Sequence, residues 1–172
     1  TWVEISDSTS PSARINHKMI YDSISGNVLL FGGMETSGYT KLDDTWVFDP
    51  DTNDWTELHS TSSPSARSSP AMYFDPIFNV VVLFGGYMQN DQLSSETWIY
   101  NCTVNTWTQI YPVMHPTTRY GHSFVYDAEQ QIGVFFGGRH LGLMDETWFF
   151  NLSSIAWIQK TPTPKPLNRY WF

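Results

Sequence analysis

The chain has 172 residues, of which 16% are aromatic and only 15% charged, so it is long enough for one buried core and has the composition of a β-rich fold with many turns. Its net charge of −8 argues against binding to nucleic acids and against adsorption to anionic membrane surfaces. No apolar run reaches membrane-spanning length, and the single cysteine, Cys102, excludes an internal disulfide while leaving the cellular compartment open.

Four short strands are predicted in the first part of the chain. The first is "HKMIYD", which begins at His17 and ends on an aspartate suited to a tight turn. The second, "NVLLFGG", is an apolar run that stops at Gly32 and Gly33, as expected of a strand buried on both faces. The third, "TWVFD", and the fourth, "DWTEL", each contain a tryptophan. No segment shows helical periodicity.

The same series of strands returns twice, at an interval of about 52 residues, which indicates a repeat architecture. Within each repeat a second tryptophan follows the first, and an aromatic residue precedes the second tryptophan. The recurring positions are the glycine pairs Gly32–Gly33, Gly85–Gly86 and Gly137–Gly138; the tryptophans Trp46, Trp98, Trp148, Trp55, Trp107 and Trp157; the aromatics Phe48, Tyr100 and Phe150; and the Pro-x-x-Arg arginines Arg14, Arg67, Arg119 and Arg169.

This pattern resembles the kelch repeat of β-propellers, in which a hydrophobic run precedes a double glycine and paired aromatics follow. The Pro-x-x-Arg motif with His17 or His122 three residues later is similar to a common kelch subtype. A WD40 repeat has a shorter period of about 40 to 45 residues. In a kelch blade we expect the double glycine to adopt a conformation closed to residues with a Cβ atom.

The resemblance therefore predicts an all-β fold of three complete four-stranded antiparallel kelch blades, at residues 10–62, 63–114 and 115–163. Residues 1–9 match the last strand of a preceding blade, and residues 164–172 match the start of a following one. Kelch rings commonly have six or seven blades, so the resemblance implies a partial propeller. Its remaining blades would come from the same protein in cis or from other chains in trans.

The repeated polar residues are predicted to be structural, because a unique site would not recur in every blade. We expect the arginines to bond carbonyls or carboxylates of neighbouring strands. The acidic residue before each Thr-Trp pair is also predicted to be structural. So is the histidine three residues after the repeated arginine, a position at which the middle repeat has proline. These residues are Asp44, Glu96 and Glu146, and His17, Pro70 and His122.

Marks of an enzymatic propeller are missing from the sequence. Copper radical oxidases of this fold need a cross-linked cysteine near the axis, but Cys102 falls in a turn held by Pro50 and Leu152 in the other repeats. Iron-dependent kelch enzymes place an acidic residue four positions before a histidine, which no histidine here has. The segment "DPDTND" from Asp49 lacks the glycine and glutamate of a calcium loop. We therefore predict no catalytic residue, no metal ligand and no cofactor.

Two N-glycosylation sequons, at Asn101 and Asn151, occupy the same turn between the third and fourth strands. If these sequons are glycosylated, the protein is a secreted or cell-surface glycoprotein. The sequons favour an extracellular location, and no other feature of the sequence decides the compartment. The alternative is that asparagine simply suits this turn.

The loops between second and third strands vary among repeats, and alternation of strand direction places them on one face with the blade-to-blade links. Variable loops on a rigid scaffold are where recognition normally occurs. The predicted binding residues, which mix aromatic and polar groups, are Tyr39, Lys41, Tyr87, Gln89, Asn90, Tyr111, Arg139 and His140.

The sequence thus favours a non-catalytic kelch interaction module that presents variable loops to a protein or glycan partner. Two alternatives stay open. The chain is a portion of an extracellular oxidase or sugar-modifying enzyme whose catalytic residues lie elsewhere, or it is a structural unit of a surface assembly.

Overall fold

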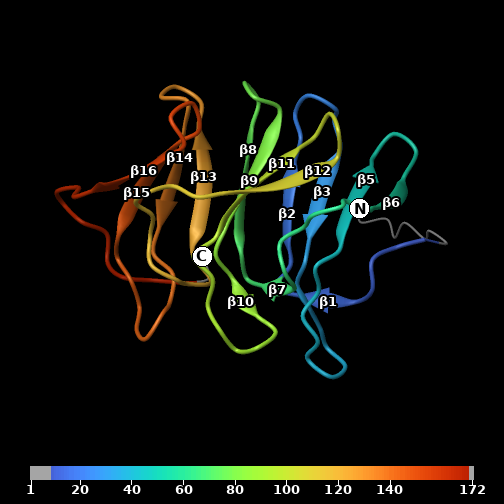
Figure 1. Ribbon diagram of the computed structural model, residues 1–172, viewed down its shortest axis with the longest axis horizontal. Coiled ribbons are helices and arrows are strands. Elements are labelled where there is room, and N and C mark those ends of the chain that lie inside the picture. Colours follow the sequence, from blue (N-terminus) through green and yellow to red (C-terminus); the bar gives the residue numbers. More distant parts are fainter. Residues whose placement is uncertain (1–8, 171–172) are drawn as a thin grey trace, which may run out of the picture.

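The computed structural model describes residues 9–170 and contains no helix in that range (Figure 1). Its longer strands form three four-stranded antiparallel sheets in which the strands follow one another in chain order. The first sheet contains β2 (Lys18–Tyr21), β3 (Val28–Phe31), β5 (Thr45–Asp49) and β6 (Asp54–Leu58). The second contains β8 (Ala71–Asp75), β9 (Val80–Phe84), β11 (Thr97–Asn101) and β12 (Thr106–Ile110). The third contains β13 (Ser123–Asp127), β14 (Ile132–Phe136), β15 (Thr147–Asn151) and β16 (Ala156–Lys160).

The predicted all-β class with three four-stranded antiparallel blades is therefore confirmed. The three sheets stand side by side, and the first strands β2, β8 and β13 are neighbours (Figure 1). Of residues 1–9, predicted to match the last strand of a preceding blade, residues 1–8 lie outside the described residues. No helix in the described part of the chain is long and apolar enough to cross a membrane.

The core lies between the sheets, where side chains of adjacent blades pack face to face. In the second and third blades, the second tryptophan connects the blade to the one before. The Trp107 ring lies 5.2 Å from that of Phe31, and its Nε1 donates to Thr45 Oγ1 at 3.0 Å. Trp157 repeats both contacts one blade later, against Phe84 and Thr97. A blade therefore buries its strands only when a neighbour covers them.

The double glycines lie where one blade meets the backbone of the next. Gly32 and Gly33 have φ of 63° and 104°, in the left-handed region that favours glycine. A Cβ atom on Gly32 would lie 2.7 Å from the carbonyl oxygen of Arg67, in the following blade. The predicted special conformation is confirmed, and the neighbouring blade supplies a second reason for glycine.

The repeated arginines are structural in the first three repeats. Arg67 is fully buried, donates to the carbonyl oxygen of Gly85 at 3.1 Å and pairs with Glu96 Oε2 at 2.5 Å. The same carboxylate oxygen accepts the Nε1–H of Trp98 at 3.0 Å. Arg14 and Arg119 form the equivalent ion pairs with Asp44 and Glu146. Each pair ties a blade-to-blade link to the third strand of its own blade.

Short additional strands lie at one end of the sheets. β1 (Arg14–Ile15) pairs with β4 (Met34–Glu35), and β7 (Arg67–Ser68) pairs with β10 (Tyr87–Met88). These two-residue pairs join each blade-to-blade link to the loop between the second and third strands. The predicted placement of the links and variable loops on one face is thereby explained.

A candidate binding cleft on the loop face

We call the side of the molecule that carries β1, β4, β7 and β10 the loop face, at the lower edge of Figure 1. Between the loops of the second and third blades it is hollowed by an open cleft of about 590 Å³. Three of the predicted binding residues line this cleft. The full lining is Tyr87, Asp91, Gln92, Leu93, Thr118, Tyr120, Arg139, His140 and Leu141.

The second-blade wall is built on the short strand β10 and the tight turn after it. Met88 N donates to the carbonyl oxygen of Gln92 at 2.8 Å, and Asp91 adopts a φ of 60° inside this turn. The turn brings Asp91 Oδ1 to 2.9 Å from the hydroxyl of Tyr87, which donates to it. This hydrogen bond orients the hydroxyl of Tyr87 and raises its pKa.

Lys41 braces this wall from the first blade. Its side chain is buried, with Nζ 4.1 Å from the centroid of the Tyr87 ring and 3.5 Å from Asp91 Oδ1. Its backbone N–H donates to Gln89 Oε1 at 2.7 Å. Lys41 is one of the predicted binding residues, and that role stays a prediction. Its contacts make it a residue that positions Tyr87 rather than an accessible contact.

The opposite wall comes from the link and loop of the third blade. Tyr120 and Arg139 exchange backbone hydrogen bonds of 3.2 and 2.9 Å, the counterpart of the short β1–β4 and β7–β10 pairs. The Tyr120 ring centroid lies 5.6 Å from that of Tyr87, so two half-buried tyrosines face each other. His140 Nδ1 lies 2.9 Å from the carbonyl oxygen of Thr118, which can only accept a hydrogen bond, and 2.8 Å from Thr118 Oγ1.

The remaining predicted binding residues lie outside the cleft. Tyr39 is 70% exposed at the tip of the first-blade loop. Tyr111 is 79% exposed, donates to Gln109 Oε1 and borders a separate, smaller hollow beside β11 and β12. Gln89 and Asn90 are exposed in the turn after β10. The cleft thus collects three of the eight predicted residues, and the binding role of all eight stays a prediction.

Sequence reasoning missed six residues of the cleft lining, of which Tyr120 is the most informative. The residue after each repeated arginine differs among repeats: Ile15, Ser68, Tyr120 and Tyr170. That variation next to a repeated position is a usable signal. The other five missed residues are Asp91, Gln92, Leu93, Thr118 and Leu141.

Comparison with known proteins identifies the repeat. The whole chain, residues 1–172, matches the family described as the KLHDC2/KLHL20/DRC7 Kelch-repeats domain. The chain belongs to this kelch family. The predicted kelch resemblance is therefore confirmed, and kelch-repeat domains generally act as protein-interaction modules.

The kelch repeats of this chain are also similar to part of a yeast protein. The relative is the tRNA wybutosine-synthesizing protein 4 of Saccharomyces cerevisiae, 28% identical over 145 residues. The alignment covers 83% of this chain but 19% of the relative.

The pKa values of two histidines in the kelch blades are lowered by burial. His122 is buried, and this burial, with the nearby charge of Arg119, lowers its pKa to about 3. His17 has its pKa lowered by burial and by Arg14. Across residues 9–170, no three His, Cys, Asp or Glu side chains are grouped so that they could hold a metal ion.

The two sequon asparagines lie at matching positions away from the loop face. Asn101 ends β11 and Asn151 ends β15, and the side-chain oxygen of each caps its own turn. Capping of this kind agrees with the alternative interpretation, in which asparagine serves the turn. Glycosylation of the two residues stays a prediction.

Proposed function

We propose that this kelch domain is a non-catalytic interaction module that binds a protein or glycan partner in the cleft on its loop face. The observation that carries the proposal is the pair of facing tyrosines, Tyr87 and Tyr120, with the exposed Arg139 beside them. These side chains come from segments that vary among the repeats, whereas the backbone that carries them repeats from blade to blade.

The chemistry of the cleft suits recognition of an extended ligand. Tyrosine and arginine are the residue types that contribute most to binding energy at interfaces, because they combine a large contact area with hydrogen-bonding groups. Lys41 and Asp91 hold the Tyr87 ring in place before a partner arrives. Such preorganisation reduces the entropy lost on binding.

The experiment that tests the proposal lets the protein select its own ligand from two large sets of candidates. The full protein is screened against a displayed library of random peptides and against a glycan array, which separate the two partner classes. Arg139→Ala and Tyr120→Ala should each weaken the selected ligand about tenfold, the loss of about 1.4 kcal/mol typical of an interface anchor.

Two further variants make the test specific. Lys41→Met removes the positive charge that holds Tyr87 in position. This variant should weaken ligand binding although residue 41 does not contact the ligand. Val104→Ala is the matched control, because Val104 is 61% exposed in the turn between β11 and β12, away from the loop face. Ligands that lose affinity with Val104→Ala and not with Arg139→Ala would show that the proposed face is the wrong one.

A second candidate function is a part in an RNA-modifying protein, and the yeast relative favours it because its name assigns it to wybutosine synthesis in tRNA. In that setting the kelch blades would bind a protein partner, since the net charge of −8 opposes contact with the RNA itself. The earlier alternatives, an extracellular enzyme with catalytic residues elsewhere and a structural unit of a surface assembly, lack a supporting observation of this kind.

The cellular location of the protein is part of the proposal as well. A secreted or cell-surface kelch domain with glycans on Asn101 and Asn151 would keep its sugars away from the loop face. The sequons are the support for this location.

A further inference from the structure

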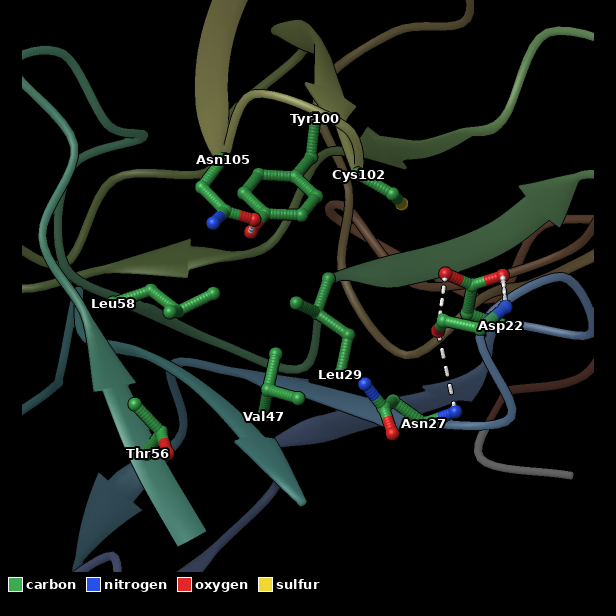
Figure 2. A pocket seen from close by; sticks show the side chains of 10 residues that line it. Asp22, Asn27, Leu29, Val47, Thr56, Leu58, Tyr100, Cys102 and Asn105 are labelled. Carbon is green, nitrogen blue, oxygen red and sulfur yellow. Dashed lines mark hydrogen bonds between the residues drawn. The ribbon is translucent and has the colours of Figure 1, made fainter. Parts of the chain in front are cut away.

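A second cavity lies between the first two blades, toward the end of the sheets opposite the loop face (Figure 2). Its volume is about 280 Å³. The side chains of Leu29, Val47 and Leu58 point into it from the first blade, and Tyr100 closes it from the second (Figure 2). These four side chains give it an apolar wall.

The repeat supplies an internal comparison for this space. At the same level between the second and third blades, the column of Val47 holds Ile99 and that of Cys102 holds Leu152. Both larger side chains pack against the buried cluster there. Between the first two blades, the smaller side chains of Val47 and Cys102 also pack against a buried cluster, and both border the cavity.

The rim of the cavity also differs from the corresponding part of the junction between the second and third blades, because it carries polar side chains. Asn27 stands in the column of Val80, which is buried in the core between the second and third blades. Asn105 stands in the column of Ile155, and its side-chain oxygen accepts the hydroxyl proton of Tyr100 at 2.9 Å. Val80 thus lies in the core of one junction, although Ile155 is 45% exposed there, while the other junction has the polar Asn27 and Asn105 beside its apolar wall.

One charged side chain, the carboxylate of Asp22, borders the cavity. Asp22 is 6% exposed, and its oxygens accept the N–H of Ile24 at 2.8 Å and the hydroxyl of Ser25 at 2.7 Å. Within residues 9–170 no lysine, arginine or histidine lies within ion-pair distance of it. Its negative charge acts on the cavity: together with the larger effect of burial, it raises the pKa of Cys102 to about 12.

We propose that this cavity binds a small organic amine, with the ammonium group toward Asp22 and a compact apolar body against Leu29, Val47 and Tyr100. The Asp22 carboxylate is already hydrogen-bonded within its own turn, and an ammonium ion would add the opposite charge that it lacks. An anionic ligand would be repelled by the same carboxylate. The neutral thiol of Cys102 contributes surface to the wall and no reaction.

The volume sets the size of the amine. Ligand pockets in proteins usually hold about 300 to 1,000 Å³, so this cavity is at the lower end and suits a body of about one ring. Phenethylamine has that size and is the probe. 2-Phenylethanol keeps the ring without the charge, and 3-phenylpropionate carries the opposite charge.

The first test titrates the full protein with each probe and follows binding by calorimetry or by NMR shifts of residues around Tyr100. Phenethylamine should bind at least tenfold more tightly than 2-phenylethanol, and 3-phenylpropionate should bind weakest. Equal affinity for the amine and the carboxylate would overturn the proposal, and so would the lack of any saturable binding of the amine.

The second test uses variants taken from the chain's own repeats. The double substitution Val47→Ile with Cys102→Leu installs the side chains of the filled junction and should abolish amine binding. Asp22→Asn keeps an oxygen acceptor for the turn. It should lower the affinity for phenethylamine to that for 2-phenylethanol. Asp127→Asn is the matched control, because Asp127 accepts the same turn hydrogen bonds in the third blade and does not border the cavity.

Two results with these variants would overturn the proposal. Amine binding that persists unchanged in both the filled variant and Asp22→Asn would overturn the proposal. Loss of binding in Asp127→Asn to the same degree as in Asp22→Asn would do the same, because it would trace the effect to the turns. Thermal melting of each variant shows whether the blades remain folded, and Asp22→Asn decides the question if the filled variant does not.

Discussion

Substituting alanine for Gly85 tests whether the neighbouring blade dictates the double glycine. Gly85 has a φ of 68°, and a Cβ atom there would lie 2.7 Å from the carbonyl oxygen of Arg119 and 2.9 Å from Cε1 of His122. The matched control is Gly26→Ala. Gly26 has a φ of 81°, but a Cβ atom there would meet nothing within 4 Å.

The two costs can be worked out separately. A left-handed backbone costs an alanine about 1 kcal/mol, and Gly26→Ala should lose about that much stability. Gly85→Ala should lose this amount plus the cost of moving the Arg119 carbonyl, which accepts a hydrogen bond of 2.9 Å from Gly86 N. Weakening that bond costs about 1 kcal/mol and the displaced packing about as much again, for a total of about 3 kcal/mol.

The assay is urea unfolding of the protein followed by tryptophan fluorescence. With a slope of about 1 to 3 kcal/mol per molar urea, Gly85→Ala should lower the midpoint about three times as far as Gly26→Ala. Equal shifts would refute the reasoning, because they would show that backbone conformation alone requires glycine at position 85.

Three other predictions concern pH, glycans and RNA. Because the pKa of His122 is lowered to about 3 in the folded state, the unfolded state takes up a proton first as pH falls below about 6.5. The contribution of His122 to stability should therefore drop by about 2 kcal/mol between pH 6.5 and 5, and urea midpoints of His122→Gln should fall less over this range than those of the parent protein; an equal fall would contradict the prediction. Intact-mass spectrometry of protein secreted by a cell that performs N-glycosylation should show hexose mass on Asn101 and Asn151, and unmodified peptides would remove the glycan prediction. Gel-shift assays at physiological salt should show no binding of tRNA at micromolar protein, because the net charge is −8, and salt-dependent binding would count against that expectation.

The blades are predictable from the sequence because residues that pack one blade against the next recur together with their partners. Trp107 and Trp157 recur because Phe31 and Phe84 recur in the preceding blades. The two-residue strands on the loop face are not predictable, since two residues are too few to show an alternating pattern. They form because the arginine link passes beside the loop of its own blade, as Arg67 does beside Met88.

The candidate cleft is predictable only in part. Variation among loops singles out Tyr87, Arg139 and His140, which line the cleft, and their binding role stays a prediction. The burial of Lys41 depends on Tyr87 and Asp91 in the next blade, and no pattern local to its own loop encodes that contact. The cavity beside Asp22 becomes apparent only when corresponding side chains of successive blades are compared by size.

The joints between blades have a consequence for how such a protein can change over time. Besides packed side chains, each joint contains a main-chain hydrogen bond: the N–H groups of Arg67, Arg119 and Arg169 donate to the carbonyl oxygens of Leu42, Ser94 and Met144. The three accepting residues have unrelated side chains, because this hydrogen bond uses only their peptide groups. The loops can therefore diverge in sequence at these positions while the hydrogen bonds between blades are kept.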